Sequence, residues 1–137
     1  MANSKTPEQF ARRLHILAEA VKANTLKNVK RAAIAADQAA VLATPVDTGR
    51  ARANWLVSIG APNYETTTST EANAALTQGR FTAGTYKLGA GGIFITNSVP
   101  YIVALDKGHS KQNPEGMTEA AIQAARRQFG DAKLLKE

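Results

Sequence analysis

The sequence contains no cysteine, which excludes disulfide bonds, thiol nucleophiles and cysteine-bound zinc. No apolar run approaches the roughly 18 residues that a membrane-spanning helix requires. The first residues, MANSKTPEQFARRLH, also lack the uninterrupted apolar core of a signal peptide. These absences predict a soluble protein that is synthesised in a reducing cytoplasm and does not contact membranes.

Recognisable catalytic chemistry is also scarce. The chain has two histidines, His15 within the first predicted helix and His109 in a later loop, three residues after Asp106. Asp106 and His109 suggest an acid–base couple, but no serine or threonine stands in a nucleophile motif beside it. Metal-ligand motifs are missing, and the glycine run at 89–92 lacks the form of a phosphate-binding loop. The sequence therefore predicts neither enzymatic activity nor a cofactor or metal, and we expect His109 to contact backbone or a neighbouring subunit.

Acidic residues are outnumbered, and the net charge is +6. The excess lies in residues 1–60, which hold nine Lys and Arg against four Asp and Glu. Four of these cations are expected along the polar side of the first helix, where they suit DNA phosphates or an acidic protein surface: Lys22, Lys27, Lys30 and Arg31. No aromatic platform accompanies them, so a solvated helix face is the plainer interpretation. A small basic nucleic-acid-binding protein remains an alternative function.

A long helix is predicted over residues 7–43. Thr6 is suited to cap it, Pro7 to occupy its first position and Gln9 to complete a capping box. From Phe10 onward apolar residues recur at mostly three- and four-residue steps, and no glycine or proline interrupts this pattern before Pro45. At 1.5 Å per residue such a helix is about 55 Å long, more than a compact domain of this size can cover. Part of it should protrude, unless a break at 24–28 folds it into two helices.

The second half of this helix is rich in alanine, in the run RAAIAADQAAVLA. Alanine allows close backbone approach, so this half is expected to lie against another helix or another subunit. Ala36 and Ala40 are accordingly predicted at a subunit interface.

The remainder predicts a single α+β domain of 137 residues, with a β-rich body over 53–108 and a C-terminal helix over 115–130 packed on a small antiparallel sheet. The alternation around Trp55 predicts the first strand, and a hairpin is expected between 86–88 and 93–96. Residues 61–84 have few large apolar groups and are predicted as an extended inserted loop, with a short helix possible inside it.

The stretch TPVDTGRARANW is predicted to be the corner where the long helix ends and the sheet begins. Gly49 is expected to supply a positive φ, and Trp55 to anchor the strand in the core. Arg50 and Arg52 should share one face of the incoming strand. We expect both arginines to meet an acidic group on a neighbouring subunit.

Two segments carry a resemblance to a known family: ATPVDTGRARANWLVSIG and IFITNSVPYIVALDKGHSKQNPEGM. Together with the long first helix and the last helix, they resemble the tail-completion and neck proteins of long-tailed bacteriophages. This is the family of the lambda-type minor tail protein Z and the related gene-10-like head–tail component. The matching positions in the two motifs are Pro45, Thr48, Gly49, Arg50 and Trp55, then Asn97, Tyr101, Gly108, Pro114 and Met117. Ala51 and Asp106 depart from the pattern, which has a larger aliphatic residue and a glutamate there.

This resemblance implies a virion protein without enzymatic activity. The family's role would be a homo-oligomeric ring, preferably a hexamer, at the head-proximal end of the tail. The ring would contact the tail terminator and the head–tail connector, and DNA in the channel could touch it passively.

Overall fold

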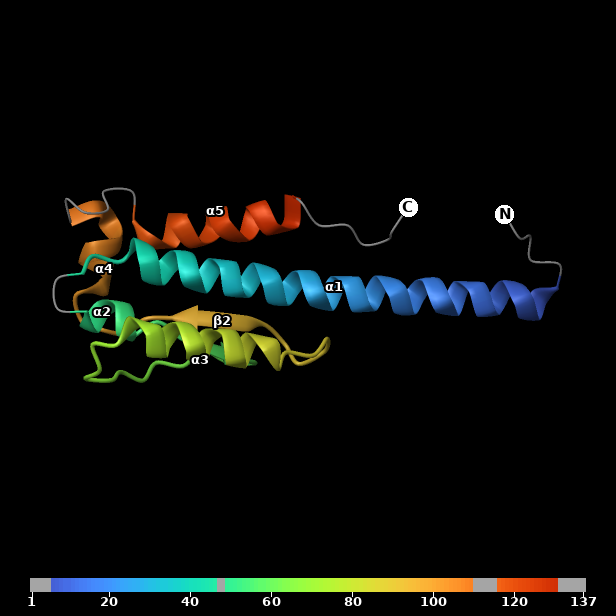
Figure 1. Ribbon diagram of the computed structural model, residues 1–137, viewed down its shortest axis with the longest axis horizontal. Helices are drawn as coiled ribbons and strands as arrows, with labels where there is room; N and C mark the ends of the chain where they lie inside the picture. The colour runs from blue at the N-terminus through green and yellow to red at the C-terminus, as the bar shows by residue number, and fades with distance from the viewer. Residues whose placement is uncertain (1–5, 47–48, 110–115, 131–137) are drawn as a thin grey trace.

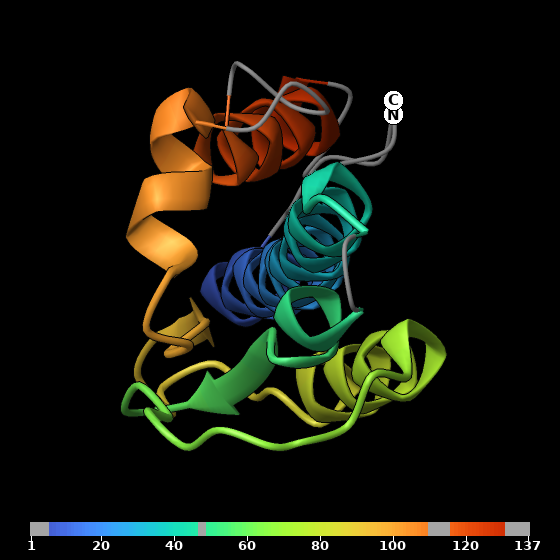
Figure 2. The same cartoon turned by 90° about the vertical axis from the view of Figure 1, so that its left-hand side faces the viewer.

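The computed structural model describes residues 6–46, 49–109 and 116–130 and confirms the α+β class. Its elements follow in the order α1 (Pro7–Ala43), α2 (Arg50–Ala53), β1 (Leu56–Ile59), α3 (Ala72–Gly84), β2 (Ile93–Thr96), α4 (Ile102–Ala104), the π-helical turn η1 (Leu105–His109) and α5 (Met117–Gly130). Figure 1 shows α1 as the axis of the molecule. Helix α5 lies along one side of α1, and α3 with the sheet lies along the other (Figures 1 and 2).

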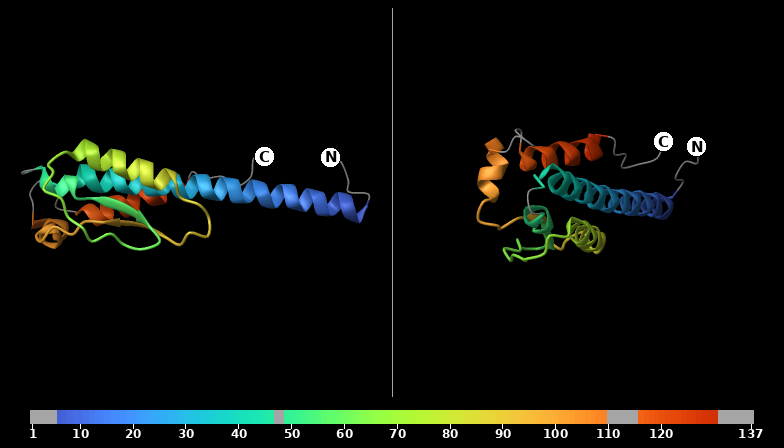
Figure 3. Two further views of the ribbon diagram at one scale, coloured as in Figure 1. Left: turned by 90° about the horizontal axis from the view of Figure 1, so that it is seen from below. Right: turned by 60° about the vertical axis from the view of Figure 1, so that its left-hand side comes forward.

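Helix α1 is continuous from Pro7 to Ala43, so the predicted long helix is confirmed and the alternative break at 24–28 is wrong. Its first turn is capped as expected, because the backbone nitrogen of Gln9 donates to Thr6 Oγ1 at 3.2 Å. Helices α3 and α5 lie beside only the C-terminal half of α1, and the N-terminal half projects past them (Figures 1 and 3).

Helix α5 packs along α1, which corrects the expectation that it covers the sheet. Met117 and Ala124 on α5 are buried, whereas Phe129 is 54% exposed. The alanine-rich surface of α1 explains the packing, because small side chains let two helices approach closely.

The segment predicted as an extended loop contains α3, a helix of 13 residues. The side of α3 that is buried consists of Ala75, Gly79 and Ala83, so it packs by close approach rather than through large apolar groups. Gln78 on the same helix bonds both backbone groups of Val57 in β1, accepting from its nitrogen at 3.1 Å and donating to its oxygen at 2.8 Å. Because α3 is part of the body, the predicted β-rich region 53–108 is in fact mixed.

The sheet is a single antiparallel pair in the part of the chain that the structure describes, with Val57 of β1 opposite Ile95 of β2. The expected hairpin between 86–88 and 93–96 is wrong, because β2 pairs with β1 and residues 86–88 form no strand. Tyr86 instead turns inward, and its hydroxyl donates to the oxygen of Gly91 at 2.6 Å.

A buried hydrogen-bond relay holds the corner between α1 and β1. Thr44 Oγ1 donates to the oxygen of Ala40 at 2.6 Å and accepts from Trp55 Nε1 at 2.7 Å. Thr44 is fully buried, and Trp55 packs with Ala40, Val41 and Met117 in the core. The predicted anchoring role of Trp55 is therefore confirmed, and the indole also has the polar partner that a buried tryptophan needs.

Replacing Thr44→Val should keep the shape of the side chain while leaving the Trp55 N–H unsatisfied. Removing one partner of a buried hydrogen bond costs about 1–3 kcal/mol, so urea unfolding should show a loss in that range. Thr68→Val is the matched control: Thr68 is exposed, and its replacement should change the stability by less than about 0.5 kcal/mol. Equal effects from the two variants would show that the relay does not stabilise the corner.

Candidate interaction surface

The N-terminal part of α1 carries an exposed row of large apolar side chains. Every residue from Thr6 to Glu19 is exposed. Steps of four, three and four residues bring Phe10, Leu14, Leu17 and Val21 onto one side of the helix. Phe10, Leu14 and Leu17 are 57%, 51% and 48% exposed, and Val21 is half-buried. We call these four residues the apolar stripe.

The basic residues predicted as a contact surface do not form one patch. Lys22 and Arg31 are nine residues apart, which at 100° per residue turns them to opposite sides of α1, about 180° from each other. Lys22 forms an ion pair with Glu19 on its own helix at 3.5 Å. Lys27 is exposed and Lys30 is half-buried. These residues therefore do not share one side of α1, and their contact with DNA or an acidic surface stays a prediction.

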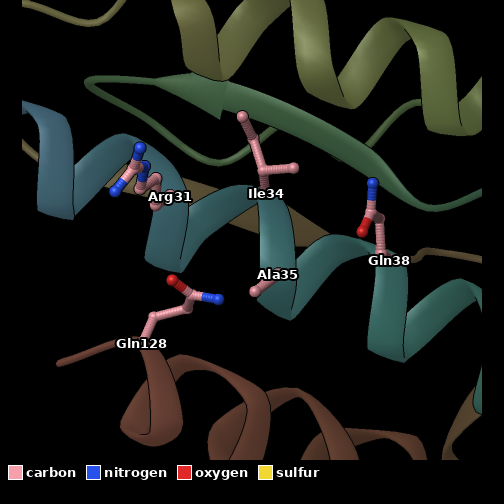
Figure 4. A pocket seen from close by; sticks show the side chains of 5 residues that line it. All are labelled: Arg31, Ile34, Ala35, Gln38 and Gln128. Atoms are coloured by element: carbon pink, nitrogen blue, oxygen red, sulfur yellow. The ribbon is translucent and has the colours of Figure 1, made fainter. Parts of the chain in front are cut away.

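A groove runs between α1 and the end of α5 (Figure 4). It is open to solvent, has a volume of about 380 Å³, and is lined by Arg31, Ile34, Ala35 and Gln38 of α1 with Gln128 of α5. In Figure 4, Ala35 lies between the longer side chains, and its small size leaves the hollow. We call these five residues the α1 groove.

Both arginines of the corner lie on the short helix α2, not on a strand. Arg52 caps the end of α1: its Nε donates to the oxygen of Thr44 at 2.7 Å and its Nη2 to the oxygen of Leu42 at 3.0 Å. Arg50 Nε donates to the oxygen of Thr67 at 3.4 Å. Both arginines thus have partners within this chain, and their expected contact with a neighbouring subunit stays a prediction.

The other residues of the first motif also serve the corner. Gly49 has φ of +82° as predicted, and a Cβ there would lie 2.8 Å from the oxygen of Thr70. Pro45 is buried where α1 ends. Thr48 lies outside the described residues.

Ala36 and Ala40, predicted at a subunit interface, are instead buried within the chain. Ala36 is 8% exposed and Ala40 is fully buried. The alanine-rich half of α1 meets α3 and α5, so the expectation that it lies against another helix is confirmed within one chain.

A buried carboxyl escaped the sequence analysis. Asp37 is 1% exposed, and its Oδ1 has no hydrogen-bond partner among the described residues. It faces α3 at Gly79, where a Cβ would overlap the carboxyl group. Burial in these surroundings raises the pKa of Asp37 from 3.8 to about 7. The only signal in the sequence for this close approach was Gly79, which lies four residues from both Ala75 and Ala83.

The second motif also supports structure. Tyr101 precedes α4 and is 40% exposed. Asp106, the suggested acid–base partner, accepts from the backbone nitrogen of Thr118 at 2.8 Å and so caps the start of α5. Gly108 lies within η1, which continues to His109. The side chain of His109 lies outside the described residues.

No protein-family model, curated protein or solved structure matches this chain. Among the described residues no three His, Cys, Asp or Glu side chains come together as metal ligands. None of the described helices is both long and apolar enough to cross a membrane. On the described surface, the apolar stripe is the candidate contact site.

Replacing Arg52→Ala should lower the free energy of unfolding by about 1–2 kcal/mol, because two carbonyl groups at the end of α1 lose a charged donor. Thermal or urea unfolding measures the change. Arg80→Ala removes an exposed arginine from α3 and should be close to neutral. If Arg52→Ala kept full stability but lost assembly, the expected subunit contact would be supported instead.

Asp37 should make stability depend on pH. Since its folded pKa is raised, its contribution to stability is fully present below about pH 4, where the carboxyl is neutral in both states, and is lost as the pH rises through about 7. The resulting loss is on the order of 4 kcal/mol, at 1.36 kcal/mol per pKa unit. Asp37→Asn should remove this decrease from urea unfolding curves recorded between pH 4 and 8, whereas Glu65→Gln, at an exposed site, should retain it. An identical pH dependence in Asp37→Asn and the unmodified chain would contradict the assignment.

Proposed function

We propose that the chain is a structural protein of a bacteriophage virion, forming a ring at the head-proximal end of the tail that completes the tail and supports head–tail joining. The observation that supports this most is the exposed apolar stripe on a helix that projects from a packed body. No residue from Thr6 to Glu19 is buried by the described part of the chain, so the large apolar side chains in that segment suit contact with other proteins.

The low stability expected for the unpacked N-terminal segment of α1 favours a protein that assembles with others. An isolated helical segment of 12–15 residues is marginal in water, because most helix stability in proteins comes from packing of one face. The segment up to Glu19 has no buried residue. A ring also requires each subunit to offer two different faces, and the projecting helix and the body are two such faces. We retain six subunits as the preferred number, by analogy with the family.

The residues of the first motif fit the same proposal. Gly49, Trp55 and Pro45 form the corner at the C-terminal end of α1. The motif therefore fixes one end of a long helix to a small body. A family whose members share that corner would share the projecting helix as well.

The alternative of a nucleic-acid-binding protein is less well supported. Its basic residues point to different sides of α1, and Lys22 is paired with Glu19. An enzymatic role for Asp106 is also disfavoured, since its carboxylate is engaged by the backbone of α5.

Electron microscopy of phage lysates tests the proposal. A phage that encodes this chain and carries a stop codon in its gene should accumulate filled heads and separate tails. Adding purified protein should place a ring on the head-proximal tail end and restore infectious particles. Normal particles in the absence of the protein, with no binding to isolated tails, would refute the proposal.

A further inference from the structure

The apolar stripe and the α1 groove belong to one continuous surface of α1. Beyond Val21 the same alternation of three and four residues reaches Asn24 and Asn28, and then the groove at Arg31, Ala35 and Gln38. One more step reaches Leu42, which is 63% exposed. An apolar repeat every 3.5 residues is the signature of a coiled-coil seam, and here the repeat is apolar from Phe10 to Val21 and polar or small from Asn24 to Gln38. We call this line of residues, from 10 to 42, the seam.

Among the described residues the seam is exposed at the apolar stripe and open to solvent at the α1 groove, whereas between them Asn24 and Asn28 are half-buried and Asn28 Nδ2 is buried. At the body end, Ala32 on one margin is buried and Val41 on the other is fully buried. The groove between these margins is nevertheless exposed to solvent. A seam of 33 residues spans about 48 Å at 1.5 Å per residue, so a helix of several turns fits along it better than a loop or a single side chain.

The charges beside the seam are all of one sign. Arg13 and Lys27 lie on one margin, at positions that flank the contact in a coiled coil, and Arg31 lies in the groove itself. The opposite margin is small and uncharged, with Ala11, Ala18 and Thr25. Glu8 and Glu19 are on the far side of the helix, by the same count of 100° per residue.

We propose that the seam binds a helix of another protein, whose apolar ridge carries acidic residues on the margin that meets Arg13, Lys27 and Arg31. The basic margin favours an acidic partner helix, because the charges that flank the contact between paired helices determine which helices pair and in which orientation. The alanine margin adds room for close approach on the other side. The inference rests on the proposed function in one respect: it gives the chemistry of a neighbour that the assembled tail would supply.

Other occupants fit the seam less well. A second copy would bring its own basic margin and has no acidic residue in its seam. DNA would use the cations but leave Phe10, Leu14 and Leu17 exposed to water. A membrane surface could accept the stripe but could not follow the seam into the α1 groove, which lies between α1 and α5 (Figure 4).

A designed peptide of four heptads, with leucine on its ridge and glutamate at both flanking positions, tests the inference with the full chain. Fluorescence anisotropy should show binding about tenfold or more tighter than that of the same peptide with lysine in place of glutamate, and weakening as salt is raised. Leu14→Asp combined with Leu17→Asp should abolish binding. Ile16→Asp is the matched control, because Ile16 is 59% exposed but lies off the seam, and it should bind normally.

The margin is tested by reversing charges. Arg13→Glu with Lys27→Glu should switch the preference to the lysine peptide, whereas Arg12→Glu with Lys30→Glu, on the other side of α1, should not. Equal binding of both peptides, binding of neither, or stronger binding to vesicles of phosphatidylserine would overturn the inference. Self-association lost in the Leu14 and Leu17 variant would overturn it in favour of a second copy.

Tail complementation separates this inference from the proposed function. If the Leu14 and Leu17 variant still completes tails, the seam inference fails and the proposed function stands. If the unmodified chain has no effect on tails while it binds the acidic peptide, the proposed function fails and the seam inference stands.

Discussion

The structure depends on one helix that is longer than the body it supports. Helix α1 runs without a break from Pro7 to Ala43, and among the described residues α3 and α5 lie beside only its C-terminal half. Helix α5 covers one side of that half, while α3 and the sheet cover another. The end of α1 is then fixed by the Thr44–Trp55 relay and by Arg52, which donates to its terminal carbonyl groups. These contacts hold the body around the C-terminal half of α1, while the N-terminal half stays exposed.

The packing around the C-terminal half of α1 uses small residues and a few hydrogen bonds instead of a large apolar core. Ala40 and Gly79 allow α1, α3 and α5 to approach closely, and Gln78 satisfies the backbone of β1 from a helix. The close approach has a cost at Asp37, whose buried carboxyl is held against α3. Stability of the body and accessibility of the seam are therefore separate properties, and surface changes on the projecting half should leave the body intact.

The sequence predicted the elements that local signals define. Thr6, Pro7 and the absence of helix breakers marked α1 to the residue, and Gly49 and Trp55 marked the corner correctly. It failed where tertiary packing decides. The small residues of α3 looked like a loop because close packing needs no large side chain, and the strand at 93–96 paired with a distant strand. Arg52 was predicted at an interface because its partner is the backbone carbonyl of Thr44, and a backbone carbonyl cannot be recognised in the sequence as an acidic residue could. The apolar stripe could be recognised in the sequence by its periodicity. The sequence did not show whether other parts of the same chain would bury it.

Hydrogen exchange on the free protein and on the protein bound to tails measures the central claim, that the projecting half of α1 is completed by a partner. In the free protein, amides between residues 10 and 21 should exchange fast, because that segment lacks tertiary contacts, while those between 32 and 43 should be protected. On tails, the first set should become protected and the second should change little. Fast exchange of the first set in both states would contradict the claim.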